Sequence, residues 1–234
     1  MRVENQPAYI LHQRPFRDTS QILEVFTKEH GRLSIMSRGS RAPKSRLKNV
    51  LQPFRALVIN WTGRGEMPTL AGAETASQSV AFLQGKSLAC ALYINELMMY
   101  LTYKHDIHEA LFSQYHQTIN RLFEAEKLEQ ELRLFEINLL ENLGVPVDFS
   151  HVVDTGEKVE ESSEYYYQIE HGLYKQQSDR KLNNIPVLSG ESLIAMSHGE
   201  FEDPKTLKDA KSLMRYIINH YLAGKNLKSR ELFR

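Results

Sequence analysis

The spacing of apolar residues changes near residue 85, and this change limits the possible folds more than any other feature of the sequence. Before it, apolar residues form short runs rich in β-branched and aromatic side chains, separated by turn residues. After it, they recur at steps of three and four, the spacing of amphipathic helices. The pattern predicts a multi-domain α+β protein, with a β domain at residues 1–80 and a helical domain at residues 81–234.

Five short strands are expected in the β domain. In the third, Leu33 and Ile35 alternate with polar residues, which predicts a strand with one buried and one solvated face. A basic connector with room for one helical turn, residues 39–49, separates the third strand from the fourth. This arrangement is typical of a small closed barrel of the OB type. The strands are expected at residues 8–13, 21–27, 32–38, 54–61 and 69–73.

The helical domain is expected to contain several helices and one β insertion. Asp203 is placed to cap the N-terminus of the last helix, Pro204 suits its first turn, and Gly224 suits its end. Residues 147–177 interrupt the helical spacing and contain turn residues beside a run of three tyrosines, which predicts one or two inserted hairpins. The earlier helices are expected at residues 86–104, 107–125 and 128–143.

The formal net charge is zero, but the charge is unevenly distributed. Residues 1–80 hold twelve Lys or Arg and six Asp or Glu, so this segment carries +6 and the remainder carries −6. Between Glu29 and Glu66 there are eight basic residues and no acidic residue. Lysine and arginine neutralise phosphates and release counterions, so the segment predicts binding to nucleic acid without sequence specificity. The alternative is a charged loop that only stays solvated.

Aromatic residues of the β domain offer a second mode of binding, because barrels of this type stack bases on aromatic rings. Trp61, beside a glycine-rich turn, is the strongest candidate, with Tyr9, Phe16, Phe26 and Phe54 also available or buried in the core. The predicted DNA contacts are Arg14, Arg17, Arg32, Arg38, Arg41, Lys44, Arg46, Lys48, Arg55, Trp61 and Arg64.

Catalytic motifs are weak in this sequence, and no enzymatic activity is predicted. Residues 85–87, Gly-Lys-Ser, lack the preceding glycine of a phosphate-binding loop, because Val80 occupies that position. His105 and His108 stand one helical turn apart but have no further metal ligands at a recognisable spacing. Cys90 lies within an apolar stretch, which favours a buried side chain over a nucleophile.

The single cysteine also excludes an internal disulfide. Residues 1–10 lack the apolar core of a signal peptide, and no apolar run approaches the roughly 20 residues that a membrane helix needs. A cytoplasmic protein that does not contact the membrane is therefore expected.

Short motifs throughout the chain resemble the RecO family of bacterial DNA-repair proteins. The C-terminal motif, Leu-Lys-Ser-Arg-Glu-Leu-Phe at residues 227–233, is the most specific of them. The others cover nearly the whole chain in the expected order. They lie at residues 8–12, 14–20, 25–27, 31–32, 39–41, 51–54, 93–97, 133–136 and 143–144.

The resemblance implies an N-terminal OB barrel and a helical domain with an inserted zinc-finger-like element. It implies a recombination mediator that binds single- and double-stranded DNA, anneals complementary strands and acts with RecR. Such proteins help to load RecA onto DNA coated by single-strand-binding protein, and they associate with the bacterial nucleoid. Many members hold zinc with four cysteines, but residues 147–177 contain none, so this element is expected to bind no metal.

The resemblance also suggests that the helical domain receives the acidic, apolar C-terminal tail of single-strand-binding protein. Its receptor must combine an apolar groove with a cation, and the candidate cations are Arg121, Arg133, Lys211 and Arg215. Two other functions stay open at this point. One is an RNA-binding, translation-associated OB protein, and the other is a hydrolase that uses the region of His105 and His108.

Overall fold

The computed structural model describes residues 2–63, 65–76, 83–124, 126–176 and 184–233. The chain divides into two compact units. The first contains Met1–Glu126 together with Leu227–Arg234, and the second contains Lys127–Asn226.

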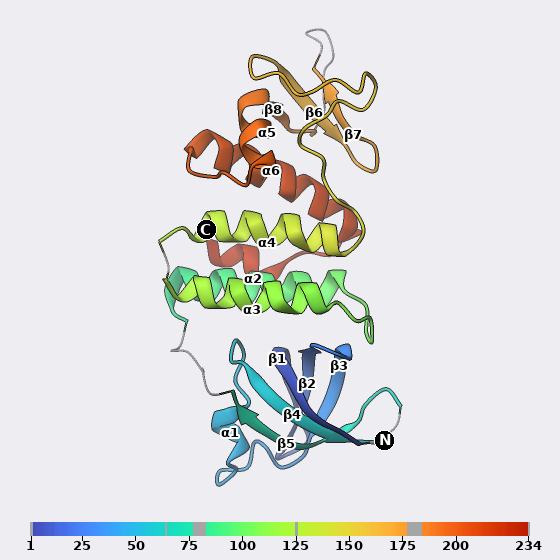
Figure 1. Ribbon diagram of the computed structural model, residues 1–234. Helices are drawn as coiled ribbons and strands as arrows, with labels where there is room; N and C mark the ends of the chain where they lie inside the picture. The colour runs from blue at the N-terminus through green and yellow to red at the C-terminus, as the bar shows by residue number, and fades with distance from the viewer. Residues whose placement is uncertain (1, 64, 77–82, 125, 177–183, 234) are drawn as a thin grey trace. The chain divides into compact units, whose positions relative to one another are not determined.

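The first unit begins with a closed barrel of five strands (Figure 1). The strands follow one another around the barrel in the order β1-β2-β3-β5-β4, and β4 pairs with β1 to close it. The structure therefore confirms the expected β-barrel. The strands are β1 (Arg2–Phe16), β2 (Ser20–Thr27), β3 (Gly31–Ser37), β4 (Leu57–Thr62) and β5 (Thr69–Thr75).

The first strand is long because it pairs with two neighbouring strands. Its N-terminal part pairs with β4 and its C-terminal part with β2, and the register shifts between Val3 and Gln6 and again between Ile10 and His12. Such irregularities bend a strand, which allows β1 to curve around the barrel. The connector between β3 and β4 contains the expected helical turn, α1 (Leu47–Val50).

The outer face of β3 is buried, contrary to the expectation of a solvated face. Leu33 and Ile35 point into the barrel core, but Arg32 and Ser34 on the other face are also buried. The reason is the helical pair α2 (Gly85–Leu101) and α3 (Glu109–Glu124), whose connecting turn lies against β3. The backbone N–H of His105 in this turn donates to the Arg32 carbonyl over 2.8 Å.

Aromatic rings and buried hydrogen bonds join the barrel to these helices. Tyr9 packs edge-on against Tyr115, with ring centroids 4.9 Å apart, and Phe26 packs against Phe112 at 5.5 Å. The Tyr115 hydroxyl donates to Asn95 over 2.6 Å. Burial raises the pKa of both the Tyr9 and the Tyr115 hydroxyls, so they stay protonated hydrogen-bond donors.

The C-terminal segment completes the first unit. A short 3₁₀ helix, η1 (Lys228–Phe233), packs against α2. The Glu96 carboxylate accepts hydrogen bonds from the backbone N–H groups of Lys228 and Ser229, each over 2.9 Å. Glu96 thus fixes the start of η1 to α2, which gives the most specific sequence motif a structural role.

The second unit combines three helices with a three-stranded sheet of order β7-β6-β8. The last helix begins as predicted, because the Asp203 carboxylate accepts from the Thr206 N–H over 2.8 Å and Pro204 occupies the first turn. The sheet confirms the expected hairpin. The elements are α4 (Leu128–Asn142), β6 (Glu164–Gln168), β7 (Gly172–Lys175), β8 (Val187–Ser189), α5 (Gly190–Ser197) and α6 (Pro204–Tyr221).

Replacement of Gly31 tests the contact between the barrel and the α2–α3 turn. Gly31 has φ +62°, and a Cβ there would overlap the backbone of Asp106. We expect Gly31→Ala to lower the free energy of unfolding by more than about 3 kcal/mol, measured by denaturant titration. Gly39 has φ +65° but open space around it, so Gly39→Ala should cost only about 1 kcal/mol. Equal losses of unfolding free energy in the two variants would contradict the close approach of Gly31 to the Asp106 backbone.

Candidate nucleic-acid interface

Two basic segments far apart in the sequence meet at one end of the barrel. The turn between β1 and β2 carries Arg17, and the connector after β3 carries Arg41. The Arg41 backbone N–H donates to the Thr19 carbonyl over 2.8 Å, and its guanidinium donates to the Arg17 carbonyl over 3.3 Å. These bonds hold the connector against the turn, so the cations of both segments share one surface.

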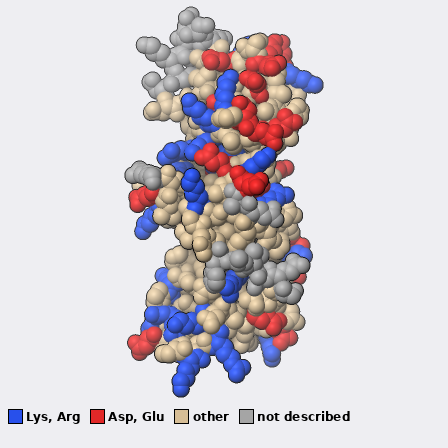
Figure 2. Space-filling view, turned by 90° about the vertical axis from the view of Figure 1, so that its left-hand side faces the viewer, with Lys and Arg blue, Asp and Glu red and all other residues tan. Residues whose placement is uncertain are grey.

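We call this surface the basic end. Its side chains are exposed, and within the described ranges none of its cations forms an ion pair with a carboxylate. Asp18 is the one acidic residue in the contributing segments, residues 14–20 and 37–55. Figure 2 shows Lys and Arg side chains projecting from the lower end of the barrel, the end that carries α1 in Figure 1. The basic end comprises Arg14, Arg17, Arg38, Arg41, Lys44, Arg46 and Lys48.

Lysines of the second unit are arranged differently, because many of them face a carboxylate. Each of these ion pairs cancels most of the field that its lysine would create, whereas the basic end keeps its positive potential. The pairs are Lys127–Glu202 at 2.8 Å, Lys175–Glu160 at 2.5 Å, Lys205–Glu191 at 3.5 Å and Lys211–Glu129 at 3.1 Å.

Comparison with known proteins identifies the family. Residues 1–79 match the family model described as "Recombination protein O N terminal", and residues 83–231 match "Recombination protein O C terminal". The chain belongs to the RecO family. It is a DNA-repair protein of that family, and its N-terminal barrel is an OB fold.

Relatives named "DNA repair protein RecO" match along nearly the full chain. The protein from Aliivibrio salmonicida is 42% identical over 230 residues, which cover 97% of this chain and 94% of the relative. The protein from Nitrosococcus oceani is 41% identical over 232 residues, or 99% and 93%. The protein from Cupriavidus pinatubonensis is 40% identical over 231 residues, or 99% and 79%. No helix within the described residues is long and apolar enough to cross a membrane.

Trp61 does not lie on the surface of this RecO-family barrel, which corrects the expectation that it stacks on bases. It is 4% exposed and packs in the barrel core with Leu57 and Ile59. These three residues alternate along β4, so they share the inward face of the strand. Among the aromatic residues named from the sequence, Phe16 is exposed instead, with its ring beside the basic end.

Arg32 is also removed from the interface, because its guanidinium is buried against the α2 end. It forms an ion pair with Glu24 at 3.2 Å and donates to the Thr102 carbonyl over 2.8 Å. Arg55 is partly buried and donates to the Asn49 carbonyl over 3.0 Å. Arg64 lies outside the described residues.

The four candidate receptors for the tail of single-strand-binding protein are not equivalent. Arg133 is 7% exposed and pairs with Glu136 at 2.8 Å within α4, so it is not a surface cation; this corrects its assignment. Lys211 and Arg215 are exposed on α6, although Lys211 pairs with Glu129. Arg121 is exposed on α3, which belongs to the first unit.

The residues considered for catalysis occupy ordinary structural positions. His108 contacts Asp106 over 2.9 Å at the exposed α2–α3 turn, and Cys90 is buried in α2. Among the described residues there is no group of three His, Cys, Asp or Glu side chains that could hold a metal ion.

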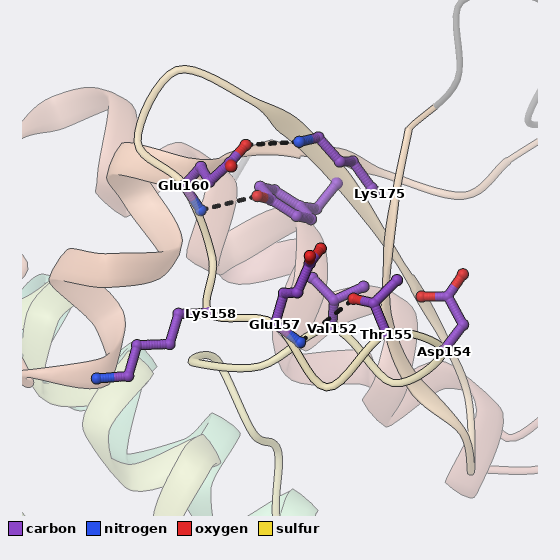
Figure 3. Close-up of a pocket in the computed structure, with 8 residues that line it drawn as sticks. Val152, Asp154, Thr155, Glu157, Lys158, Glu160 and Lys175 are labelled. Atoms are coloured by element: carbon purple, nitrogen blue, oxygen red, sulfur yellow. Dashed lines mark hydrogen bonds and ion pairs between the residues drawn. The ribbon is translucent and has the colours of Figure 1, made fainter.

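The inserted hairpin element contains a small surface pocket lined largely by charged side chains (Figure 3). Lys175 reaches across it to Glu160 over 2.5 Å, and this hydrogen bond lowers the pKa of the Glu160 carboxyl. The Tyr165 hydroxyl accepts from the Glu160 backbone N–H over 2.8 Å. These contacts tie the loop to the sheet of the inserted element, and the absence of zinc stays a prediction.

Arg32→Ala tests whether Arg32 stabilises the fold, in contrast to the exposed arginines of the basic end. Among the described residues, its loss leaves the partly buried Glu24 carboxylate with Lys104 and Ser34 as partners, so we expect the free energy of unfolding to fall by about 2–3 kcal/mol. Arg38→Ala, at an exposed position just after the opposite end of β3, should change it by less than about 0.5 kcal/mol. Denaturant unfolding of both variants measures the difference, and a destabilised Arg38→Ala protein would argue against the assignment.

Proposed function

We propose that the basic end binds the phosphate backbone of single- and double-stranded DNA. The observation that carries the proposal is a set of seven exposed cations that form no ion pair with any described carboxylate, on the OB barrel of a DNA-repair protein. Exposed cations without a carboxylate partner bind phosphates strongly, because binding releases the counterions condensed on DNA. Flexible lysine and arginine side chains on a connector contact phosphates without reading the base sequence.

Such a surface supports strand annealing. Two complementary strands repel each other through their phosphates, and a protein that neutralises the phosphates lets the strands approach and search for register. Base pairing then supplies the free energy. No covalent bond is made or broken, so the proposed activity needs no catalytic group, and we propose that the protein is not an enzyme.

The proposal extends to a role as recombination mediator. In this role, the protein acts with RecR in the bacterial cytoplasm at the nucleoid. It helps RecA to replace single-strand-binding protein on DNA. Family membership supports this role, since both parts of the chain match recombination protein O. The second unit serves as a docking site for the acidic tail of single-strand-binding protein.

Salt titration tests DNA binding by the basic end. With six or seven phosphate contacts, the slope of log K against log salt should be roughly −4 to −5 for single strands. Affinity should then fall about 300- to 900-fold between roughly 50 and 200 mM salt. Replacement of Arg38, Arg41, Lys44 and Arg46 together by Ala should flatten the slope by about 3, because about 0.7 is lost per cation.

A matched control removes the same number of charges from the second unit, with Ala at Lys127, Lys158, Lys175 and Lys205. The slope of this variant should equal that of the unaltered protein. A flat titration of the unaltered protein, or equal effects of both quadruple variants, would refute the proposal. Preferred binding of RNA in direct competition would instead favour a role with RNA.

Charge reversal tests the tail-binding site. We expect Lys211→Glu with Arg215→Glu to weaken binding of an acidic, apolar tail peptide by about fivefold or more, since each exposed pair contributes roughly 0.2–1 kcal/mol. Fluorescence anisotropy of a labelled peptide measures the affinity. A third reversal, Arg121→Glu, shows whether the first unit contributes.

Lys175→Glu with Lys205→Glu is the control, because these lysines are exposed and paired like Lys211, but with Glu160 and Glu191 instead of Glu129. Unchanged peptide affinity after reversal at Lys211, Arg215 and Arg121 would exclude them as the receptor.

A further inference from the structure

Phe16 is an exposed aromatic residue beside Arg17 of the basic end. It is the last residue of β1 and pairs with Ser20, so it stands directly at the β1–β2 turn. Its side chain is 36% exposed, whereas Tyr9, Phe26 and Trp61 of the same barrel are all below 5%. The ring is therefore partly open to a ligand, unlike the other three.

The turn holds an arginine over this ring. Arg17 has φ +54°, a left-handed conformation that costs a non-glycine residue about 1 kcal/mol. In that conformation its guanidinium carbon lies 5.3 Å from the Phe16 ring centroid, within the range of a cation–π contact. The Arg17 carbonyl accepts a hydrogen bond from Arg41, so the connector of the basic end helps to keep the turn in place.

The ring and the guanidinium together form a platform for a planar ligand among phosphate-binding cations. Aromatic rings stack on nucleobases whatever the base, and guanidinium groups stack on them as well. In a duplex the bases are already stacked on one another, so the platform has access only to an unpaired base.

We infer that Phe16 stacks on an unpaired base of single-stranded DNA bound at the basic end. The inference rests on the proposed function, and it adds a preference for single-stranded DNA, which the cations alone do not supply. Phosphate contacts hold single strands and duplexes alike, whereas the ring adds affinity only for the single strand. When a complementary strand pairs with the bound one, its bases leave the ring, and the annealed duplex is held less tightly than the strand that entered.

Phe16→Ala tests the inference. Affinity for an oligothymidylate of about 20 nucleotides should fall by about 5- to 30-fold, the lower part of the range for an aromatic residue that stacks on one base. Affinity for a duplex of the same length should change by less than about twofold. The salt slope for the single strand should not change, because stacking releases no counterions.

An abasic oligonucleotide separates stacking from a structural role. It keeps the phosphates and removes the bases, so the unaltered protein and Phe16→Ala should bind it equally. Phe16→Trp should retain the affinity for oligothymidylate, and single-stranded DNA should quench its fluorescence beyond the signal from the buried Trp61. Tyr103→Ala is the control, since Tyr103 is 78% exposed on the α2–α3 turn, away from the basic end.

The outcomes separate the inference from the function on which it rests. If Phe16→Ala binds the single strand normally while the quadruple basic-end variant loses its salt slope, the inference is wrong and the proposed function stands. Equal weakening of single strand, duplex and abasic strand would show that Phe16 only shapes the turn, which also overturns the inference. If the quadruple variant keeps its slope, DNA binding by the basic end itself fails.

Discussion

The contact between the barrel and the α2–α3 pair determines which part of the barrel surface stays exposed for the proposed binding of DNA. It buries the outer face of β3 and the aromatic residues Tyr9 and Phe26. An uncovered OB barrel presents a sheet face on which bases stack. Here helices occupy that part of the outer surface, so the exposed cations remain at the end formed by the β1–β2 turn and the connector. The position of the proposed DNA-binding surface thus follows from how the helices pack.

The same contact explains why two arginines close in sequence differ in role. Arg32 lies under the helices, where Glu24 compensates its charge and Thr102 accepts its hydrogen bonds. Arg38 lies beyond the helices, in a segment without acidic residues. A buried cation requires a partner, because desolvation would otherwise cost several kcal/mol. An exposed cation requires none, and its field stays available to a ligand.

Local patterns predicted the elements of this fold well. The five strands, the helical turn of the connector and the Asp203 cap depend on neighbouring residues, and the structure confirms all of them. Alternation in β3 located the strand but not its second buried face, because that burial comes from helices some 70 residues later in the sequence. The burial of Arg32 could not be predicted from neighbouring residues for the same reason, because it also comes from these helices.

For the candidate site, the structure exposes the charged segment, whose binding to DNA stays a prediction, and it buries the aromatic residue expected to stack on bases. Trp61 was favoured because it lies beside a glycine-rich turn, although it shares the spacing of Leu57 and Ile59, which face the core. A strand-face argument would have placed it inside. Phe16 ends its strand and precedes a polar turn, and its side chain stays partly exposed.

Phosphate-binding cations and an exposed aromatic ring would give one end of the barrel two separate ways to bind a DNA strand. Cations on a connector bind any phosphate chain, and their contribution weakens as salt rises. A ring fixed at a β turn distinguishes an unpaired base from a paired one, and its contribution is independent of salt. A protein that anneals strands needs both properties, because it must hold each strand firmly before pairing and release the duplex afterwards. The hydrogen bonds between Arg41 and the β1–β2 turn place the two kinds of side chain on one surface, so a single approaching strand meets them together.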